Sequence, residues 1–87
     1  MFNLYIGADN ATGRLDRFTI REITSKAFKG FTMIDAAGIW QGKAEASIIL
    51  QIETLDRDQV LRLAQVLKSE LHQDAIGIQE TPTLSFI

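Results

Sequence analysis

The pattern of apolar and polar residues along the chain predicts six elements of secondary structure. Strict alternation marks strands, and apolar residues that recur every three or four positions mark helices. The predicted elements are a strand over residues 2–7, a helix over 16–28, strands over 31–40 and 44–53, a helix from Asp56 to Leu71 and a strand over 75–78. The last residues, 81–87, form a further extended segment, in which Pro82 prevents a fully paired central strand.

Capping and turn signals predict where several elements end. Lys29-Gly30 closes the first helix, where a glycine C-cap belongs. Asp56, with Gln59 three residues later, resembles a capping box at the start of the second helix. The polar residues 41–43 form a short turn between the two middle strands, which predicts a hairpin. The apolar stripe of the second helix consists of Val60, Leu63, Ala64, Leu67 and Leu71.

The order strand, helix, strand, strand, helix, strand predicts an α+β protein with the ferredoxin-like split βαβ arrangement, in a single domain over residues 1–87. Both helices would cover one face of an antiparallel sheet. The other face would carry Tyr5, Ser47, Ile49, Gln51 and Gln79. Because this face is too apolar in places for contact with solvent alone, we expect it to meet another subunit.

Composition narrows the classes of function and partner. With 87 residues and 46% hydrophobic content, the chain forms a small core and is expected to gain stability by association. The net charge of −2 and the scattered Lys and Arg residues argue against nucleic acid as a partner. The absence of Cys excludes disulfides and thiolate sites. The single His, His72, cannot build a His-based metal site within one chain, so we expect no metal and no cofactor. We also expect a cytoplasmic protein without membrane contact, since no stretch approaches the ~20 apolar residues of a membrane span and no signal peptide is apparent.

One segment, residues 38–47 with the sequence GIWQGKAEAS, combines residues suited to binding a ligand. Its candidate site residues are Trp40, Gln41, Gly42, Lys43, Glu45 and Ser47, with Tyr5 from the first strand. Each also has a structural interpretation: Trp40 as an anchor between subunits, residues 41–43 as turn chemistry, Glu45 as a solvated charge and Tyr5 as packing. Residues 9–13, DNATG, offer either an anion cradle or an ordinary turn, and residues 72–74 are interpreted chiefly as the end of the second helix.

Three segments resemble small bacterial and phage domains related to the phage-encoded S-adenosylmethionine lyases, a family formerly described as hydrolases. They are LYIGADNATG (4–13), GFTMIDAAGIWQGKAEAS (30–47) and LHQDAIGI (71–78). The resemblance implies a PII-like ferredoxin fold, a homotrimer, and an adenosyl ligand bound in clefts between subunits. It also gives Glu45 the place of an active-site acid at the start of the third strand. The chain departs from the family at Trp40, where the lyases have a Tyr, and an indole lacks the phenol oxygen.

The activity implied by this resemblance is cleavage of S-adenosylmethionine, or of a nucleotide conjugate of it, to a methylthioadenosine-type product and homoserine lactone. Glu45 and an aromatic face would suit the sulfonium, and Lys43 or the turn amides would hold the carboxylate. Gly42 would let the backbone approach the ligand. Two alternatives stay open: a non-catalytic PII-like nucleotide sensor, and an oligomeric module that binds a host protein. The short loop after the second strand argues against a sensor with a long mobile arm.

Overall fold

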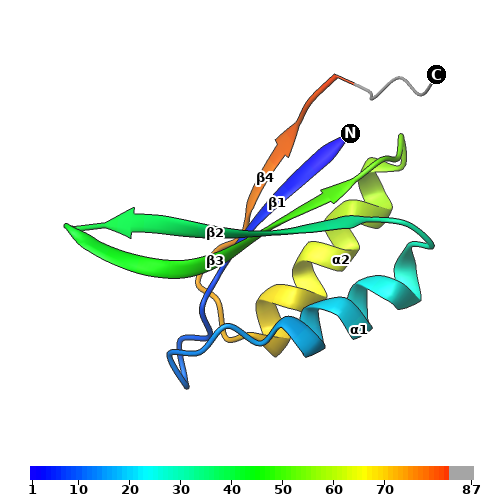
Figure 1. Ribbon diagram of the computed structural model, residues 1–87. Coiled ribbons are helices and arrows are strands. Elements are labelled where there is room, and N and C mark those ends of the chain that lie inside the picture. Colours follow the sequence, from blue (N-terminus) through cyan, green and yellow to red (C-terminus); the bar gives the residue numbers. More distant parts are fainter. Residues whose placement is uncertain (83–87) are drawn as a thin grey trace.

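The computed structural model describes residues 1–82, with Trp40 described through its backbone only. Its elements are β1 (Phe2–Gly7), α1 (Arg17–Ala27), β2 (Thr32–Trp40), β3 (Lys43–Ile52), α2 (Arg57–Glu70) and β4 (Gly77–Glu80). The strands form one antiparallel sheet in the order β2-β3-β1-β4, and both helices cover the same face of it (Figure 1). This α+β arrangement is compatible with a ferredoxin-like fold. The extended segment predicted at the C-terminus lies beyond the described residues from position 83 onward.

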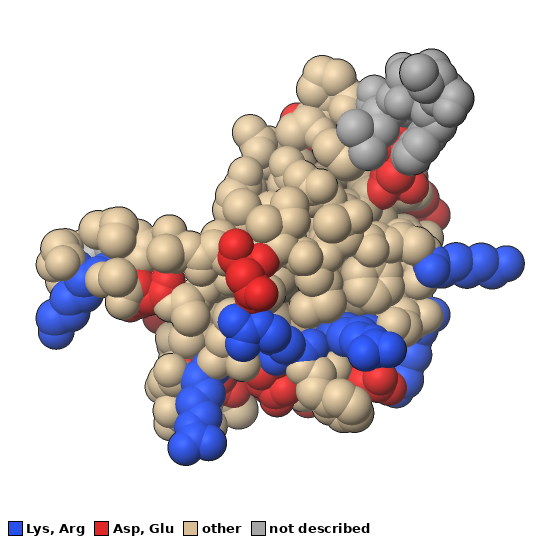
Figure 2. Space-filling model, viewed as in Figure 1, with Lys and Arg blue, Asp and Glu red and all other residues tan. Residues whose placement is uncertain are grey.

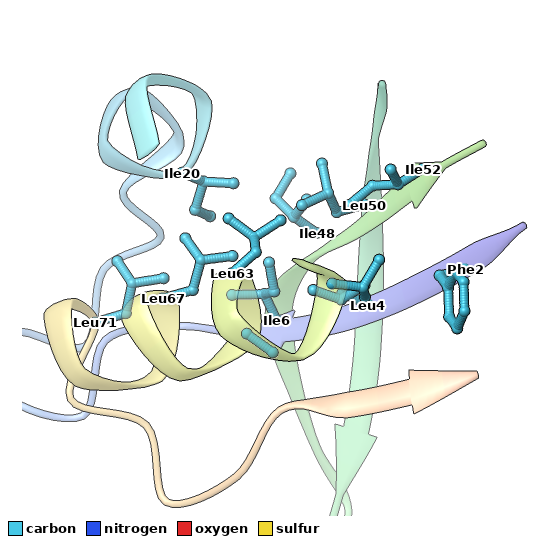
Figure 3. Close-up of a cluster of buried hydrophobic side chains, with 12 residues drawn as sticks. Phe2, Leu4, Ile6, Ile20, Ile48, Leu50, Ile52, Leu63, Leu67 and Leu71 are labelled. Atoms are coloured by element: carbon cyan, nitrogen blue, oxygen red, sulfur yellow. The ribbon is translucent and has the colours of Figure 1, made fainter. Parts of the chain in front are cut away.

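The core lies between the sheet and the two helices. Residues of β1 and β3 that lie opposite each other point to the same side, and the pairs Phe2↔Ile52, Leu4↔Leu50 and Ile6↔Ile48 are all buried. The helices add Ile20 from α1 and the predicted stripe of α2, whose members Val60, Leu63, Ala64, Leu67 and Leu71 are all buried (Figure 3). Full burial of one such side chain stabilises the fold by about 1.5–3 kcal/mol. The apolar faces predicted for β1 and α2 are therefore confirmed.

The glycine C-cap predicted for α1 is wrong. The helix ends at Ala27, and its C-cap Phe28 has extended backbone while its N–H donates to the Thr24 carbonyl oxygen at 2.9 Å. Gly30 lies outside the helix and does not adopt a positive φ. Because the chain leaves α1 in extended conformation toward β2, no left-handed residue is needed at this helix end.

The capping box predicted for α2 is only half formed. The Asp56 carboxylate accepts a hydrogen bond from the Gln59 N–H at 3.0 Å, which confirms the N-cap. The Gln59 side chain instead donates to the Ala27 carbonyl oxygen at 2.7 Å, and so joins the end of α1 to the start of α2. The last strand is also displaced from the prediction: β4 occupies Gly77–Glu80, and it pairs with β1 from Phe2↔Glu80 to Tyr5↔Gly77.

Candidate functional site

The candidate segment lies mainly on a two-stranded ribbon that projects from the sheet. β1 pairs with β3 only as far as Gly7↔Ser47, whereas β2 and β3 stay paired to Trp40↔Lys43. Residues 37–46, here called the ribbon, therefore have no strand beside them except each other, and Figure 1 shows them extending past both helices. Because an isolated two-stranded ribbon is marginally stable in water, this segment is suited to contact with another surface.

The tip of the ribbon is a tight turn of two residues. Gln41 and Gly42 have φ values of 50° and 77°, both in the left-handed region that a type I′ hairpin turn requires. The predicted turn over residues 41–43 is one residue too long, since Lys43 already pairs with Trp40 as the first residue of β3. The backbone of the turn is sufficient to explain Gly42, and a turn of this length is no mobile arm.

The two faces of the ribbon differ in chemistry. Side chains alternate along a strand, so Lys43, Glu45 and Ser47 share the face of the sheet that the helices leave uncovered. Lys43 and Glu45 are exposed, and their backbones lie about 7 Å apart along β3. Within residues 1–82 the Glu45 carboxylate has no hydrogen-bond or ion-pair partner. The opposite, helix-side face of the ribbon is apolar and consists of Ala37, Ile39, Ala44 and Ala46.

Tyr5 shares the uncovered face but lies away from Glu45 within one chain. It pairs with Ile49, four positions along β3 from Glu45, which corresponds to about 13 Å. Its hydroxyl donates a hydrogen bond to Gln79 Oε1 at 2.8 Å. Ser47 lies between them, opposite Gly7. A single subunit therefore places these predicted residues on one surface without bringing Tyr5 and Glu45 into contact.

The uncovered face carries the residues predicted for it, arranged in rows across the sheet. One row is polar, with Thr32, Gln51, Asn3 and Gln79 side by side. The next is largely apolar, with Ile34, Ile49 and Tyr5, of which Ile34 is 37% and Tyr5 is 44% exposed. Asn3 is buried, and its side-chain oxygen finds no hydrogen-bond partner among the described residues. This row therefore places partly exposed apolar side chains on the face for which the sequence predicts contact with another subunit.

A cluster around Asp9, which the sequence patterns did not single out as a site, occupies the end of β1. The Asp9 carboxylate accepts hydrogen bonds from the backbone N–H groups of Ala11 and Thr12, at 2.7 and 3.2 Å. It also lies 3.1 Å from His72 Nδ1. The loop amides that would have formed an anion cradle are thus occupied by Asp9. The Asp-x-x-Thr pattern typical of such turns was the available signal, but His72 is distant in sequence.

The Asp9 cluster joins the first loop to the end of α2. His72 has a φ of 53°, and the Gln73 N–H donates to the Lys68 carbonyl oxygen at 2.9 Å, which closes the helix C-terminus. The hydrogen bond with His72 lowers the pKa of Asp9, although burial of the carboxylate opposes this shift. These contacts give His72 and Gln73 a structural role, in agreement with the interpretation from sequence.

A groove of about 630 Å³ between α1 and α2 contains none of the predicted site residues. Its lining includes the apolar side chains of Ile23, Leu63 and Val66 and the basic side chains of Lys26 and Arg62. In the described part of the chain, no three His, Asp or Glu side chains are grouped closely enough to hold a metal ion. Neither described helix has the length and apolar character needed to cross a bilayer.

No protein-family model matches the chain, and no curated protein matches it significantly.

Proposed function

We propose that this protein is an S-adenosylmethionine lyase with a PII-like ferredoxin fold, which acts as a homotrimer and binds its ligand between subunits. The observation that supports this most strongly is the placement of Glu45 and Lys43. Both residues are exposed, and both side chains lie on the uncovered face of the ribbon. Among residues 1–82, the Glu45 carboxylate has no hydrogen-bond or ion-pair partner. An anion and a cation about 7 Å apart along one strand complement a ligand that carries both a sulfonium and a carboxylate.

The reaction needs little covalent chemistry from the protein. A carboxylate oxygen of the methionine moiety attacks its own γ-carbon, and the bond from that carbon to sulfur breaks. The bonding electron pair stays on sulfur, which leaves as the neutral thioether of methylthioadenosine, while the attacking part closes to homoserine lactone. No water and no external acid or base enters this step. The protein therefore contributes mainly by holding the reacting groups in line and by electrostatics.

Glu45 is the residue that we expect to orient the sulfonium. In one subunit its carboxylate is exposed, and water weakens its attraction for a cation. A neighbouring subunit packed on the apolar row with Ile34, Ile49 and Tyr5 would exclude that water and place further side chains beside the ligand. The backbone of Trp40 and the turn residue Gln41 lie at the end of the same ribbon, and Ser47 lies on the same face of β3 as Glu45.

The test is incubation of the purified protein with S-adenosylmethionine, followed by mass analysis for methylthioadenosine and homoserine lactone. Glu45→Gln keeps the shape of the side chain and removes its charge, and we expect turnover to fall by ~10-fold or more, at least ~1.4 kcal/mol of transition-state stabilisation. Glu70→Gln, which removes a charge from the end of α2, is the matched control and should retain activity. Equal turnover by the parent and the Glu45 variant would remove Glu45 from the site, and absence of product from the parent would exclude the lyase.

A second candidate function is that of a protein-binding module. It is favoured by the helix-side face of the ribbon, where Ile39 is 70% exposed among alanines and carries no charged neighbour on its own face. A nucleotide sensor is less well supported, because the two-residue turn at Gln41 and Gly42 provides no long loop to report ligand binding.

A further inference from the structure

The groove of about 630 Å³ between α1 and α2 has the size and the lining of a site for a small ligand. Pockets for small molecules have volumes of about 300–1,000 Å³ and are lined mainly by apolar side chains with a few polar groups. The apolar side chains here are those of Ile23, Leu63 and Val66. Leu63 is buried, whereas Val66 is 47% exposed, so a ligand can reach the lining from solvent. No residue of the ribbon lines the groove, and an inference about it does not rest on the proposed lyase activity.

The two ends of the groove carry opposite charge. Gln59 Nε2 donates to the Ala27 carbonyl oxygen at 2.7 Å, so the end of α1 lies beside the start of α2, and the helices run in opposite directions (Figure 1). Lys26 and Arg62, which both line the groove, lie within one turn of this contact and form its cationic end. At the other end the lining includes Glu70, the last residue of α2, which makes that end anionic.

The two basic side chains of the cationic end are free within residues 1–82. Neither Lys26 nor Arg62 takes part in an ion pair or a hydrogen bond there. Glu22 and Asp58 lie one turn before them on the same helices, yet neither is bound to them, and exposed pairs of this spacing contribute only about 0.3–0.5 kcal/mol. Figure 2, viewed as in Figure 1, shows several basic side chains over the region of the helices. An anionic ligand would therefore meet two cations with little competition from the chain itself.

We propose that this groove binds a single molecule of an unbranched aliphatic carboxylate. The carboxylate would lie between Lys26 and Arg62, whose guanidinium can donate two parallel N–H bonds to it. The hydrocarbon chain would lie along Ile23, Leu63 and Val66, which removes apolar surface of both partners from water. Charge complementarity selects this orientation, because the anionic end of the groove would repel the carboxylate.

The length of the groove limits the length of the ligand. Arg62 and Glu70 are separated by eight positions in α2, which corresponds to about 12 Å at about 1.5 Å per residue. An extended chain of about ten carbons has the same length, given bonds of about 1.5 Å in a zigzag. A short carboxylate would meet the cations and leave the apolar side chains uncovered. A dicarboxylate of full length would bring its second charge beside Glu70, so decanoate is the matching probe.

Isothermal titration calorimetry with decanoate, at concentrations below those at which it forms micelles, tests this inference. Decanoate should bind saturably at one site per chain and raise Tm, because a ligand that binds only the folded state stabilises it. Butyrate, 1-decanol and decanedioate should each bind more weakly by ~10-fold or more, since each lacks the chain, lacks the charge or adds a repelled one. In NMR spectra, decanoate should shift the backbone amide signals of α1 and α2 and leave those of the ribbon unchanged.

A pair of double variants tests the cationic end. Lys26→Gln combined with Arg62→Gln should weaken decanoate binding by ~10-fold or more, because both charges that face the carboxylate are removed. Arg21→Gln combined with Lys68→Gln is the matched control, since it removes one cation from each helix outside the groove. The control should bind decanoate within about twofold of the parent, because the removed charges are exposed and screened by salt. Circular dichroism should show the same helix content in both double variants.

Several results would overturn the inference. One is the absence of saturable decanoate binding, and another is a fall in Tm with decanoate, which would show that it acts as a detergent. Equal binding by the two double variants, or binding of 1-decanol as tight as that of decanoate, would exclude recognition of the carboxylate. Amide shifts confined to the sheet or the loops would place the ligand elsewhere. Binding to phosphatidylglycerol vesicles without binding of decanoate would assign the basic side chains to a membrane surface instead.

Discussion

Truncation of Leu67 to Ala tests the packing of α2 on the sheet. Leu67 is fully buried, and Figure 3 shows it between Leu63 and Leu71, pointing to the same side of the helix and toward Ile20. The substitution removes three carbons, a transfer cost of about 2.4 kcal/mol at about 0.8 kcal/mol per buried group. A residual cavity of about 50 Å³ adds about 1.2 kcal/mol, at about 24 cal/mol per Å³. We therefore expect the free energy of unfolding to fall by about 3.5 kcal/mol.

Thermal unfolding followed by circular dichroism measures this effect. For a domain of this size, 1 kcal/mol corresponds to about 4–8 °C, so the Tm of Leu67→Ala should fall by about 14–28 °C. Val66→Ala is the matched control, because Val66 is next to Leu67 in the chain but is 47% exposed. The free energy of unfolding of this variant should differ from that of the parent by less than about 1 kcal/mol. All samples must have the same protein concentration, since association shifts Tm. If Leu67→Ala melts within about 4 °C of the parent, Leu67 is not packed in the core and the placement of α2 is wrong.

Three further outcomes follow from the turn, the Asp9 cluster and the uncovered face. Gly42→Ala places a Cβ on a residue with a φ of 77° and should destabilise the ribbon by about 1 kcal/mol, whereas Gln41→Gly removes a Cβ from a residue with positive φ and should stabilise it. The two variants should therefore shift the midpoint of chemical denaturation in opposite directions. Equal shifts would contradict a type I′ turn. Because the pKa of Asp9 is lowered in the folded state, the ionised carboxylate stabilises the fold above the ordinary aspartate pKa, and this stabilisation is lost as pH falls through the folded pKa. In unfolding measured across pH, His72→Ala should weaken this loss of stability in acid. An unchanged pH dependence would show that the contact of His72 with Asp9 does not contribute to stability. Light scattering should give three times the 9.7 kDa subunit mass and a lower mass for Ile49→Glu, while a monomeric parent at micromolar concentration would exclude the cleft between subunits.

Features that depend on neighbouring residues could be predicted from the sequence. Alternation along residues 2–7 predicted the buried apolar face of β1, although Asn3 on its other face is also buried, and the stripe through Leu67 predicted the buried face of α2. The Asp56 N-cap was equally predictable, because its side chain binds an N–H only three residues away. Such features follow from the geometry of a single strand or helix, whose periods place residues on one face wherever the element lies in the fold.

Features that join distant parts of the chain could not be predicted in this way, because they depend on how the elements pack. Gln59 fits the capping pattern by sequence, yet its side chain bonds to Ala27, because the ends of two helices meet there. The contact of Asp9 with His72 spans 63 positions, and no local pattern selects one carboxylate for one imidazole across that separation. The projection of the ribbon is likewise non-local. The patterns of β2 and β3 predict a hairpin, but they do not show that β1 ends at Gly7. Because β1 ends there, no third strand pairs with the tip of the hairpin, which carries most of the candidate site.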